Sequence, residues 1–196
     1  MLAISTSWMP PESSMSDWLL QVKNMGFSAV ELSYRISQPQ LEEALQTLKK
    51  LNLGVSSIHN FCPTPYDGPT TRHVSNYYRL SSVDEEERKS AVKWTKAAID
   101  TAKRVGAQVI VIHAGQVDVD DERSRKLFDF FTTGQEDTPA FASERSRILQ
   151  LREKQRGRFI EALEKSLSEL IAYIKGQSVK IGLETRFYPL KFLTLM

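Results

Sequence analysis

The sequence Val109-Ile110-Val111-Ile112-His113-Ala114-Gly115 decides the fold class of this 196-residue chain. It is the most apolar stretch of the chain, and a continuous β-branched run of this kind is typical of a strand buried in a parallel sheet. Three further short runs end in a residue able to bind a metal or move a proton: Ala29-Val30-Glu31, Val55-Ser56-Ser57-Ile58-His59 and Ile181-Gly182-Leu183-Glu184. Because α/β folds carry out their chemistry at the carboxyl ends of parallel strands, we expect the four ionisable side chains to line one bowl.

Helical patterns separate the apolar runs. The expected strands cover residues 2–7, 28–33, 54–60, 108–114 and 180–185, and the expected helices cover 16–26, 39–51, 82–105, 121–131 and 146–175. Strands that alternate with helices indicate a parallel sheet with helical crossovers. Two connections, residues 62–82 and 115–143, are long, and loops of that length inside a compact domain are usually functional or mobile.

Composition excludes several classes of protein. Hydrophobic residues make up 41% of the chain and charged residues 26%, which is ordinary for a globular domain. A net charge of +2 produces no strong field toward nucleic acid or a membrane. The N-terminus lacks a signal-peptide pattern, and no apolar run approaches the roughly 20 residues of a membrane span. We therefore expect a single cytoplasmic domain over residues 1–196, with the one cysteine, Cys62, buried and inert.

Several features leave alternatives open. Basic and acidic residues interleave between residues 122 and 161, which indicates either a solvated helix face with ion pairs or a phosphate-binding surface. The aromatic residues of the 128–131 segment either pack a short helix down or close the top of a site. Glu31 suits a structural carboxylate as well as a substrate contact, whereas an unpaired core glutamate at position 184 would be costly. We expect His73, in the polar loop, to be solvated.

The strand motifs resemble those of a known family. They are Gly26-Phe27-Ser28-Ala29-Val30-Glu31-Leu32, Ile58-His59, Val111-Ile112-His113-Ala114-Gly115 and Gly182-Leu183-Glu184-Thr185. In this order the chain resembles the xylose-isomerase-like TIM barrels, which include sugar isomerases and epimerases, inosose dehydratases and nucleases of the endonuclease IV type. The resemblance implies an α/β fold of the (β/α)8 TIM-barrel type. A complete barrel takes around 250 residues, and only five strands are found here, so we expect the C-terminal part to be missing.

The resemblance also implies roles for individual residues. Glu184 matches the glutamate that binds the divalent metal and, in the sugar enzymes, transfers a proton as the catalytic base. His59 and His113 are similar to histidines that bind metal in the nucleases and contact substrate in the sugar enzymes. Glu31 and Arg186 are expected to contact substrate. The metal implied is Mn²⁺, Mg²⁺ or Zn²⁺. Whether this chain binds it is left open, because the family's other metal ligands lie on strands six to eight.

Three functions follow from the resemblance. The leading hypothesis is a metal-dependent isomerase or epimerase that acts on a sugar or polyol. An endonuclease IV-like phosphodiesterase acting on abasic DNA is disfavoured by the near-neutral charge, so a nucleic-acid partner is not expected. The third hypothesis is a non-catalytic remnant that binds a ligand. An open five-stranded sheet exposes both edge strands, so we also expect a homo-oligomer.

Overall fold

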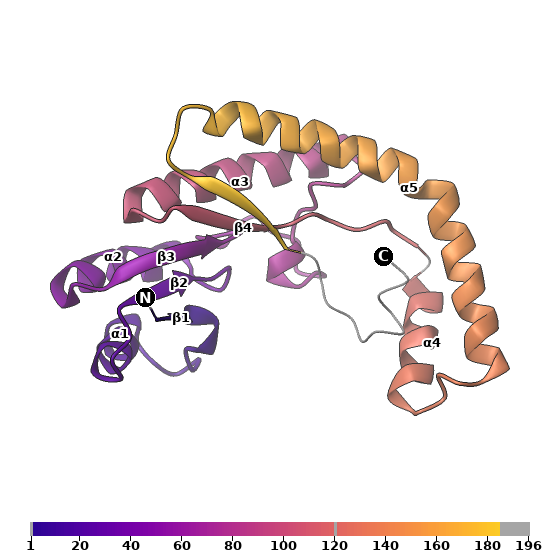
Figure 1. Cartoon of the computed structure of the whole chain (residues 1–196), viewed down its shortest axis with the longest axis horizontal. Coiled ribbons are helices and arrows are strands. Elements are labelled where there is room, and N and C mark those ends of the chain that lie inside the picture. The colour runs from indigo at the N-terminus through magenta and orange to yellow at the C-terminus, as the bar shows by residue number, and fades with distance from the viewer. Residues whose placement is uncertain (1, 120, 185–196) are drawn as a thin grey trace.

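The computed structural model describes residues 2–119 and 121–184, which form one parallel sheet covered by helices (Figure 1). The strands lie in the order in which they occur along the chain: β1 (Ala3–Ser5), β2 (Ala29–Leu32), β3 (Gly54–His59), β4 (Val109–His113) and β5 (Lys180–Glu184). The expected α/β class and the five parallel strands are confirmed. The first four strands are shorter than their sequence patterns indicate, and Thr185, the expected end of the fifth, lies outside the described residues.

The helices follow the expected alternation with strands. They are α1 (Met15–Asn24), α2 (Gln38–Leu51), α3 (Glu85–Val105), α4 (Asp121–Thr132) and α5 (Pro139–Ile174), with 3-10 turns η1 (Thr6–Trp8) and η2 (Val74–Asn76). The expected start of the first helix was wrong, because the Ser14 hydroxyl accepts from the amide of Asp17 and caps α1. The last helix also begins earlier than residue 146, since Thr138 caps it and Pro139 occupies its first turn.

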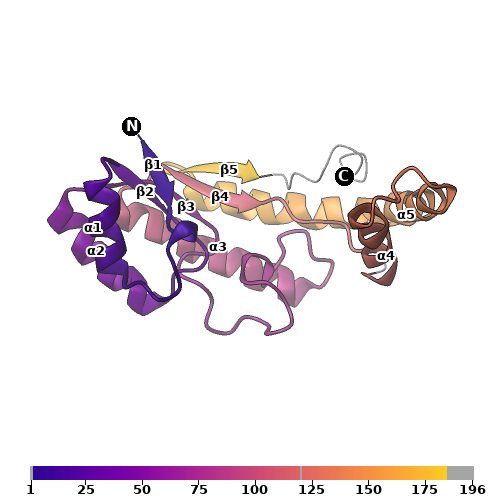
Figure 2. The same ribbon diagram turned by 90° about the horizontal axis from the view of Figure 1, so that it is seen from below.

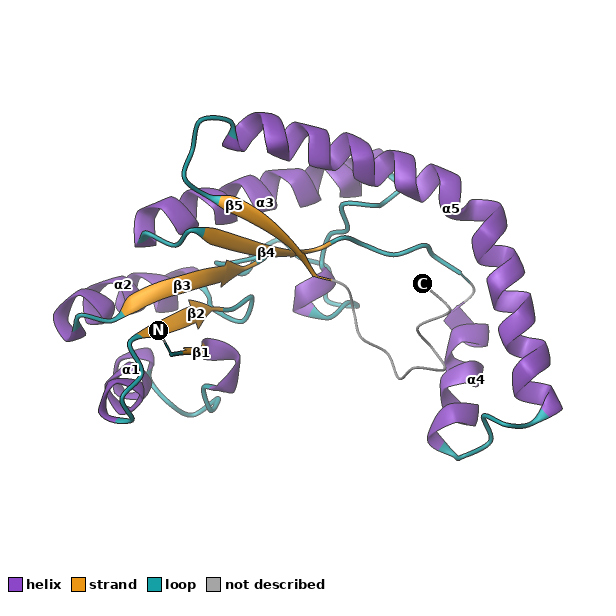
Figure 3. Cartoon of the chain, in the orientation of Figure 1, coloured by secondary structure: helices purple, strands orange, loops and turns teal. Residues whose placement is uncertain are grey.

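One face of the sheet packs against the helices, as the side-on view shows (Figure 2). The side chains of Ile58, Ile110 and Ile112 point to this face and are completely buried. The intervening residues Val109 and Val111 are only partly buried on the other face. The apolar run of β4 is therefore fully buried on one face only, because no described helix covers the second face (Figure 3).

The helices α4 and α5 form an extension with a small apolar cluster of its own, Leu127, Phe141 and Ile148. Phe130 and Phe131 pack against this cluster, which favours the packing interpretation of the aromatic segment. The exposed ion pair Arg156–Glu153, at 2.9 Å, agrees with the interpretation of the interleaved charges as a solvated face. Glu144, which pairs with Arg123 at 2.8 Å, is instead buried. In the described part of the chain, every helix is too short or too polar to cross a membrane.

Cys62 follows β3 and lies in the main core. Burial raises the pKa of its thiol to about 12, so the thiol stays protonated at neutral pH. This agrees with the expectation of a buried, inert cysteine.

Candidate metal centre

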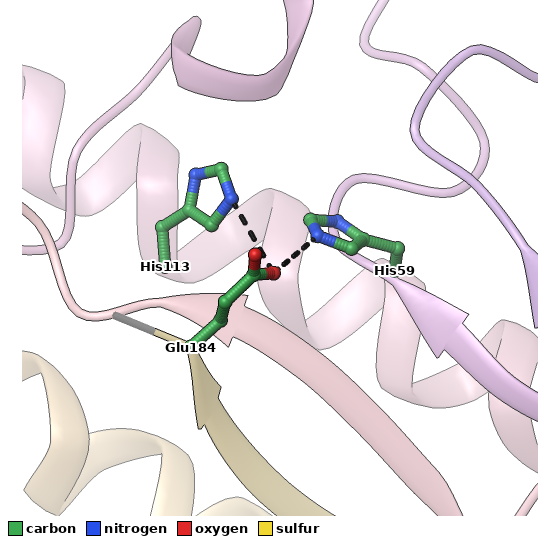
Figure 4. Close-up of side chains that lie close together, drawn as sticks. All are labelled: His59, His113 and Glu184. Carbon is green, nitrogen blue, oxygen red and sulfur yellow. Dashed lines mark hydrogen bonds and ion pairs between the residues drawn. The ribbon is translucent and has the colours of Figure 1, made fainter. Parts of the chain in front are cut away.

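Three of the strand-end residues converge at one point of the sheet (Figure 4). His59 ends β3, His113 ends β4 and Glu184 ends β5, and one ligand atom from each lies within 4.8 Å of the others. The Oε2 atom of Glu184 is 2.9 Å from His59 Nε2 and 3.7 Å from His113 Nε2. The sequence pattern thus correctly predicted that these three side chains meet.

The register of the strands explains this convergence. His113 pairs directly with Glu184 across β4 and β5. His59 pairs with Val111, which lies two residues before His113 and points to the same face of the sheet. The three side chains therefore lie on the face that no described helix covers, at the carboxyl ends of neighbouring parallel strands.

Glu31 lies on the same face but outside this group. A register shift after Val30 leaves Ser56 unpaired and pairs Glu31 with Ser57, two residues before His59. The Ser57 hydroxyl donates to the Glu31 carboxylate at 2.8 Å. Glu31 therefore lies on the expected face but is not part of the close group of three. That Glu31 contacts substrate stays a prediction. The same is true of Arg186, which lies outside the described residues.

Both histidine rings are oriented by carbonyl oxygens. His59 Nδ1 lies 3.1 Å from the main-chain oxygen of Asn60, and His113 Nδ1 lies 3.1 Å from Asn76 Oδ1. A carbonyl oxygen accepts hydrogen bonds but donates none, so these two contacts favour the tautomer with a proton on Nδ1. Each Nε2 is directed at Glu184, and at His59 a proton lies between Nε2 and the carboxylate over the 2.9 Å contact. The sequence did not mark Asn76, because nothing in a long polar loop distinguishes one asparagine from another.

An aromatic residue that the sequence analysis missed lies beside the histidines. The ring of Tyr34 packs edge-on against that of His59, with centroids 5.1 Å apart, and also against that of His73 at 5.7 Å. His73 is exposed, as expected, but it is more than a solvated side chain, since its Nδ1 lies 2.8 Å from Ser75 Oγ. In the sequence, the one indication that Tyr34 lies near the centre is its position two residues after the Glu31 motif.

The loop that carries Asn76 is attached to the first turn of α3 by Glu87. This carboxylate accepts hydrogen bonds from Arg72 at 2.6 Å and Arg79 at 3.0 Å, and from the Ser82 hydroxyl at 3.0 Å. Burial alone would raise the pKa of Glu87, but the hydrogen bonds from Arg79 and Arg72 lower it to about 2. Glu87 therefore stays ionised and holds the loop against the helix.

A cavity of about 710 Å³ lies next to the three-residue group, between the segment after β4 and the helices α4 and α5. Ala114 and Gly115, which follow His113 directly, form one wall, and Phe128 on α4 forms part of another. Phe128 is half exposed. Unlike Phe130 and Phe131, it lines the cavity, where it could close over a site as the alternative interpretation of the aromatic segment expects.

Two imidazoles and one carboxylate form a donor set that suits Zn²⁺ or Mn²⁺. Ligand atoms that share a cation at about 2.1 Å can be at most about 4.2 Å apart, so the observed separations of up to 4.8 Å need only a small side-chain rotation. Three protein ligands leave coordination positions for water or substrate, as catalytic metal sites require. The three residues therefore fit a divalent metal.

The parallel strands follow one another in chain order, and candidate metal ligands lie at their carboxyl ends. These features define a barrel-type α/β protein. A family model described as xylose isomerase-like TIM barrel matches residues 19–189, and the chain belongs to this family. Comparison with curated proteins finds no match of comparable significance.

Solved structures with the same fold include an epimerase, an epimerase-like protein and a dehydratase. The structure of 3-keto-D-glucoside 4-epimerase from E. coli has a TM-score of 0.57 at 18% identity and aligns with 92% of this chain and 54% of its own. A D-tagatose 3-epimerase-like protein has a TM-score of 0.56 at 18% identity, with 93% and 52% covered. Mannonate dehydratase from Streptococcus suis serotype 2 has a TM-score of 0.50 at 9% identity, with 93% and 52% covered. The chain spans about half the length of these proteins, and identities this low show the fold alone.

Proposed function

We propose that this protein is a metal-dependent isomerase or epimerase that acts on a sugar or polyol. The observation that carries the proposal is the convergence of His59, His113 and Glu184 at the ends of adjacent parallel strands. An epimerase and an epimerase-like protein among the solved structures of the same fold support the choice of substrate class. The proposed ligands are the two Nε2 atoms and the Glu184 carboxylate.

Glu184 has the geometry to serve as both ligand and base. Both histidine contacts use Oε2, which leaves Oε1 to accept a proton, since no described residue bonds to it. A divalent cation bound here would polarise a substrate carbonyl and its neighbouring hydroxyl. Glu184 would remove the proton from the carbon next to the carbonyl and, in isomerisation, return it to the carbonyl carbon. In epimerisation, a second acid on the opposite face of the substrate would return a proton to the same carbon. Glu31 and Arg186 are proposed to orient the substrate hydroxyls.

A thermal-shift measurement tests the metal site. At 100 times its dissociation constant, a bound metal stabilises the folded state by about 2.7 kcal/mol, which for a domain of this size raises Tm by about 5–10 °C. We expect Mn²⁺ or Zn²⁺ to produce this rise in the wild type and not in Glu184→Gln. Glu164→Gln removes an exposed carboxylate of α5 and serves as the matched control. A wild type that does not respond to either metal would favour the non-catalytic remnant.

The chemistry is tested by proton exchange. When a ketose is incubated with the metal-loaded protein in D₂O, we expect deuterium to appear at the carbon next to the carbonyl, as NMR detects. Glu184→Gln should abolish this exchange, and Glu164→Gln should retain it. Metal binding without exchange on any sugar tested would argue against the isomerase chemistry while leaving the metal site intact.

A phosphodiesterase remains the second candidate, because both Nε2 atoms lie close to the Glu184 carboxylate, at 2.9 and 3.7 Å, where both histidines could be metal ligands, the role that the resemblance gives them in the nucleases. Cleavage of abasic duplex DNA by the wild type, absent in Glu184→Gln, would favour this function over isomerisation.

We also propose that copies of the chain associate. Among the described strands β5 pairs only with β4, and Leu183 on β5 and Ile171 on α5 are 54% and 60% exposed. Apolar residues on an edge strand and its neighbouring helix favour contact with another copy. A concentration-independent monomer mass in analytical ultracentrifugation would contradict this proposal.

A further inference from the structure

Asn76 is the last residue of η2, a single turn within the long connection between β3 and α3. Its side-chain oxygen lies 3.1 Å from His113 Nδ1. On the other side of the same ring, Nε2 lies 3.7 Å from the Glu184 carboxylate, as Figure 4 shows for the latter two residues. The imidazole of His113 is thus placed between a loop amide and the candidate metal centre.

The two histidines of the centre obtain the same orientation by different means. His59 directs Nδ1 at a main-chain oxygen, that of Asn60, which the fold supplies whatever the side chain at that position. His113 directs Nδ1 at a side-chain oxygen, that of Asn76, which a substitution can remove. A neutral imidazole carries one proton, and holding it on Nδ1 leaves the lone pair of Nε2 to bind a metal.

The loop is fixed close to His113 by a second contact. The Ser81 hydroxyl donates to the Gln116 carbonyl at 2.9 Å and accepts from the Gln116 amide at 3.0 Å. Gly115 permits this approach, because a Cβ at that position would lie 2.3 Å from Ser81 Oγ and its φ is +105°. The segment that leaves β4 is thereby clamped to the end of the loop that carries Asn76.

The turn itself is also well supported. The amide of Asn76 donates to the His73 carbonyl at 2.8 Å, and the His73 ring packs against Tyr34, which in turn contacts His59. Asn76 is therefore held relative to both histidines of the centre and is not simply a loop residue that happens to lie nearby.

We propose that Asn76 is a positioning residue: it holds His113 in the tautomer with the proton on Nδ1, so that Nε2 is available as a metal ligand. The inference rests on the proposed metal centre, but its first consequence, the tautomer, exists in the metal-free protein. Carbonyl and carboxylate partners of this kind typically contribute about 10–100-fold to metal affinity.

The tautomer is measured by ¹⁵N NMR of the imidazole nitrogens in metal-free protein, at a pH at which His113 is neutral. The chain has three histidines, so the spectra are readily assigned. We expect the wild type and Asn76→Asp, which keeps an acceptor oxygen, to show His113 protonated at Nδ1. In Asn76→Leu, which keeps the size and removes the acceptor, we expect a mixture of tautomers. His59 should be unchanged in every variant and serves as an internal control.

Metal affinity gives the second measurement, by calorimetric titration with Mn²⁺ or Zn²⁺. We expect Asn76→Leu to lose about 10–100-fold in affinity and Asn76→Asp to retain or exceed the wild-type value. Asn24→Ala, at the exposed end of α1, controls for loss of an asparagine elsewhere. Thermal unfolding of each variant shows whether it is folded.

The possible outcomes separate the two proposals. If the wild type binds no metal but Asn76→Leu changes the His113 tautomer, the proposed function fails while the positioning role of Asn76 stands. If the wild type binds metal, and Asn76→Leu has the wild-type tautomer and affinity, the inference about Asn76 is overturned while the metal centre stands. An equal loss of affinity in Asn76→Leu and Asn76→Asp would also overturn it, because the acceptor oxygen would then have no effect.

Discussion

The two faces of the sheet carry different side chains from the same strands. On the helix-covered face, Ile58, Ile110 and Ile112 are completely buried and supply the apolar contacts that hold the layers together. On the other face, the residues that alternate with them include His59 and His113, whose side chains retain some exposure and contact polar partners. The comparison teaches that one strand can carry stability on one side and the residues of the proposed metal centre on the other, because successive side chains point in opposite directions.

The largest difference in stability is expected between substitutions of two neighbouring residues of β4 that point to opposite faces of the sheet. Ile110→Ala should lower the free energy of unfolding by about 3–4 kcal/mol, because it removes a fully buried side chain and leaves a cavity. Val111→Ala removes a partly exposed side chain from the other face and should cost about 1 kcal/mol. Chemical denaturation measures both. Losses of similar size would mean that the second face is covered as closely as the first.

An intermediate effect is expected at the base of the loop that carries Asn76. Glu87→Gln weakens hydrogen bonds to Arg72 and Arg79 and should cost about 2 kcal/mol, as loss of hydrogen bonds to a charged group does. Glu86→Gln changes the neighbouring, exposed carboxylate and should change stability by less than about 0.5 kcal/mol. Urea denaturation at neutral pH measures both, and equal effects would show that the Glu87 cluster does not stabilise the loop.

The same cluster predicts a dependence on pH. The pKa of Glu87 is lowered from 4.5 to about 2 in the folded protein. Its ionised form is therefore favoured by folding, and the stabilisation is present above pH 4.5 and is lost as the pH falls toward 2. The difference in stability between the wild type and Glu87→Gln should shrink over that range. A constant difference would exclude ionisation of Glu87 as the source.

The sequence predicted the class of fold and most of the centre for a common reason. Apolar runs identify parallel strands, and parallel strands align their ends, so His59, His113 and Glu184 could be brought together without knowledge of any contact. Glu31 lies on the same face but apart from these three. One unpaired residue in β3 sets the register that pairs Glu31 with Ser57, and nothing in Val55-Ser56-Ser57 shows which serine is unpaired. Asn76 and Tyr34 were missed because their roles depend on how loops fold back, which local patterns do not encode.

Apart from the control substitution Glu86→Gln, the smallest effect on stability is expected at the residue proposed to matter most for function. Glu184 is 41% exposed on its side chain, and glutamine keeps an oxygen and an amide to face His59. We therefore expect Glu184→Gln to change the free energy of unfolding of the metal-free protein by less than about 1 kcal/mol, as chemical denaturation measures. The stabilisation by Mn²⁺ or Zn²⁺ should nevertheless disappear. A loss close to that of Ile110→Ala would instead mean that the contact between His59 and Glu184 is a structural ion pair. The second face would then also serve stability, and convergence of the three side chains would no longer argue for a metal centre.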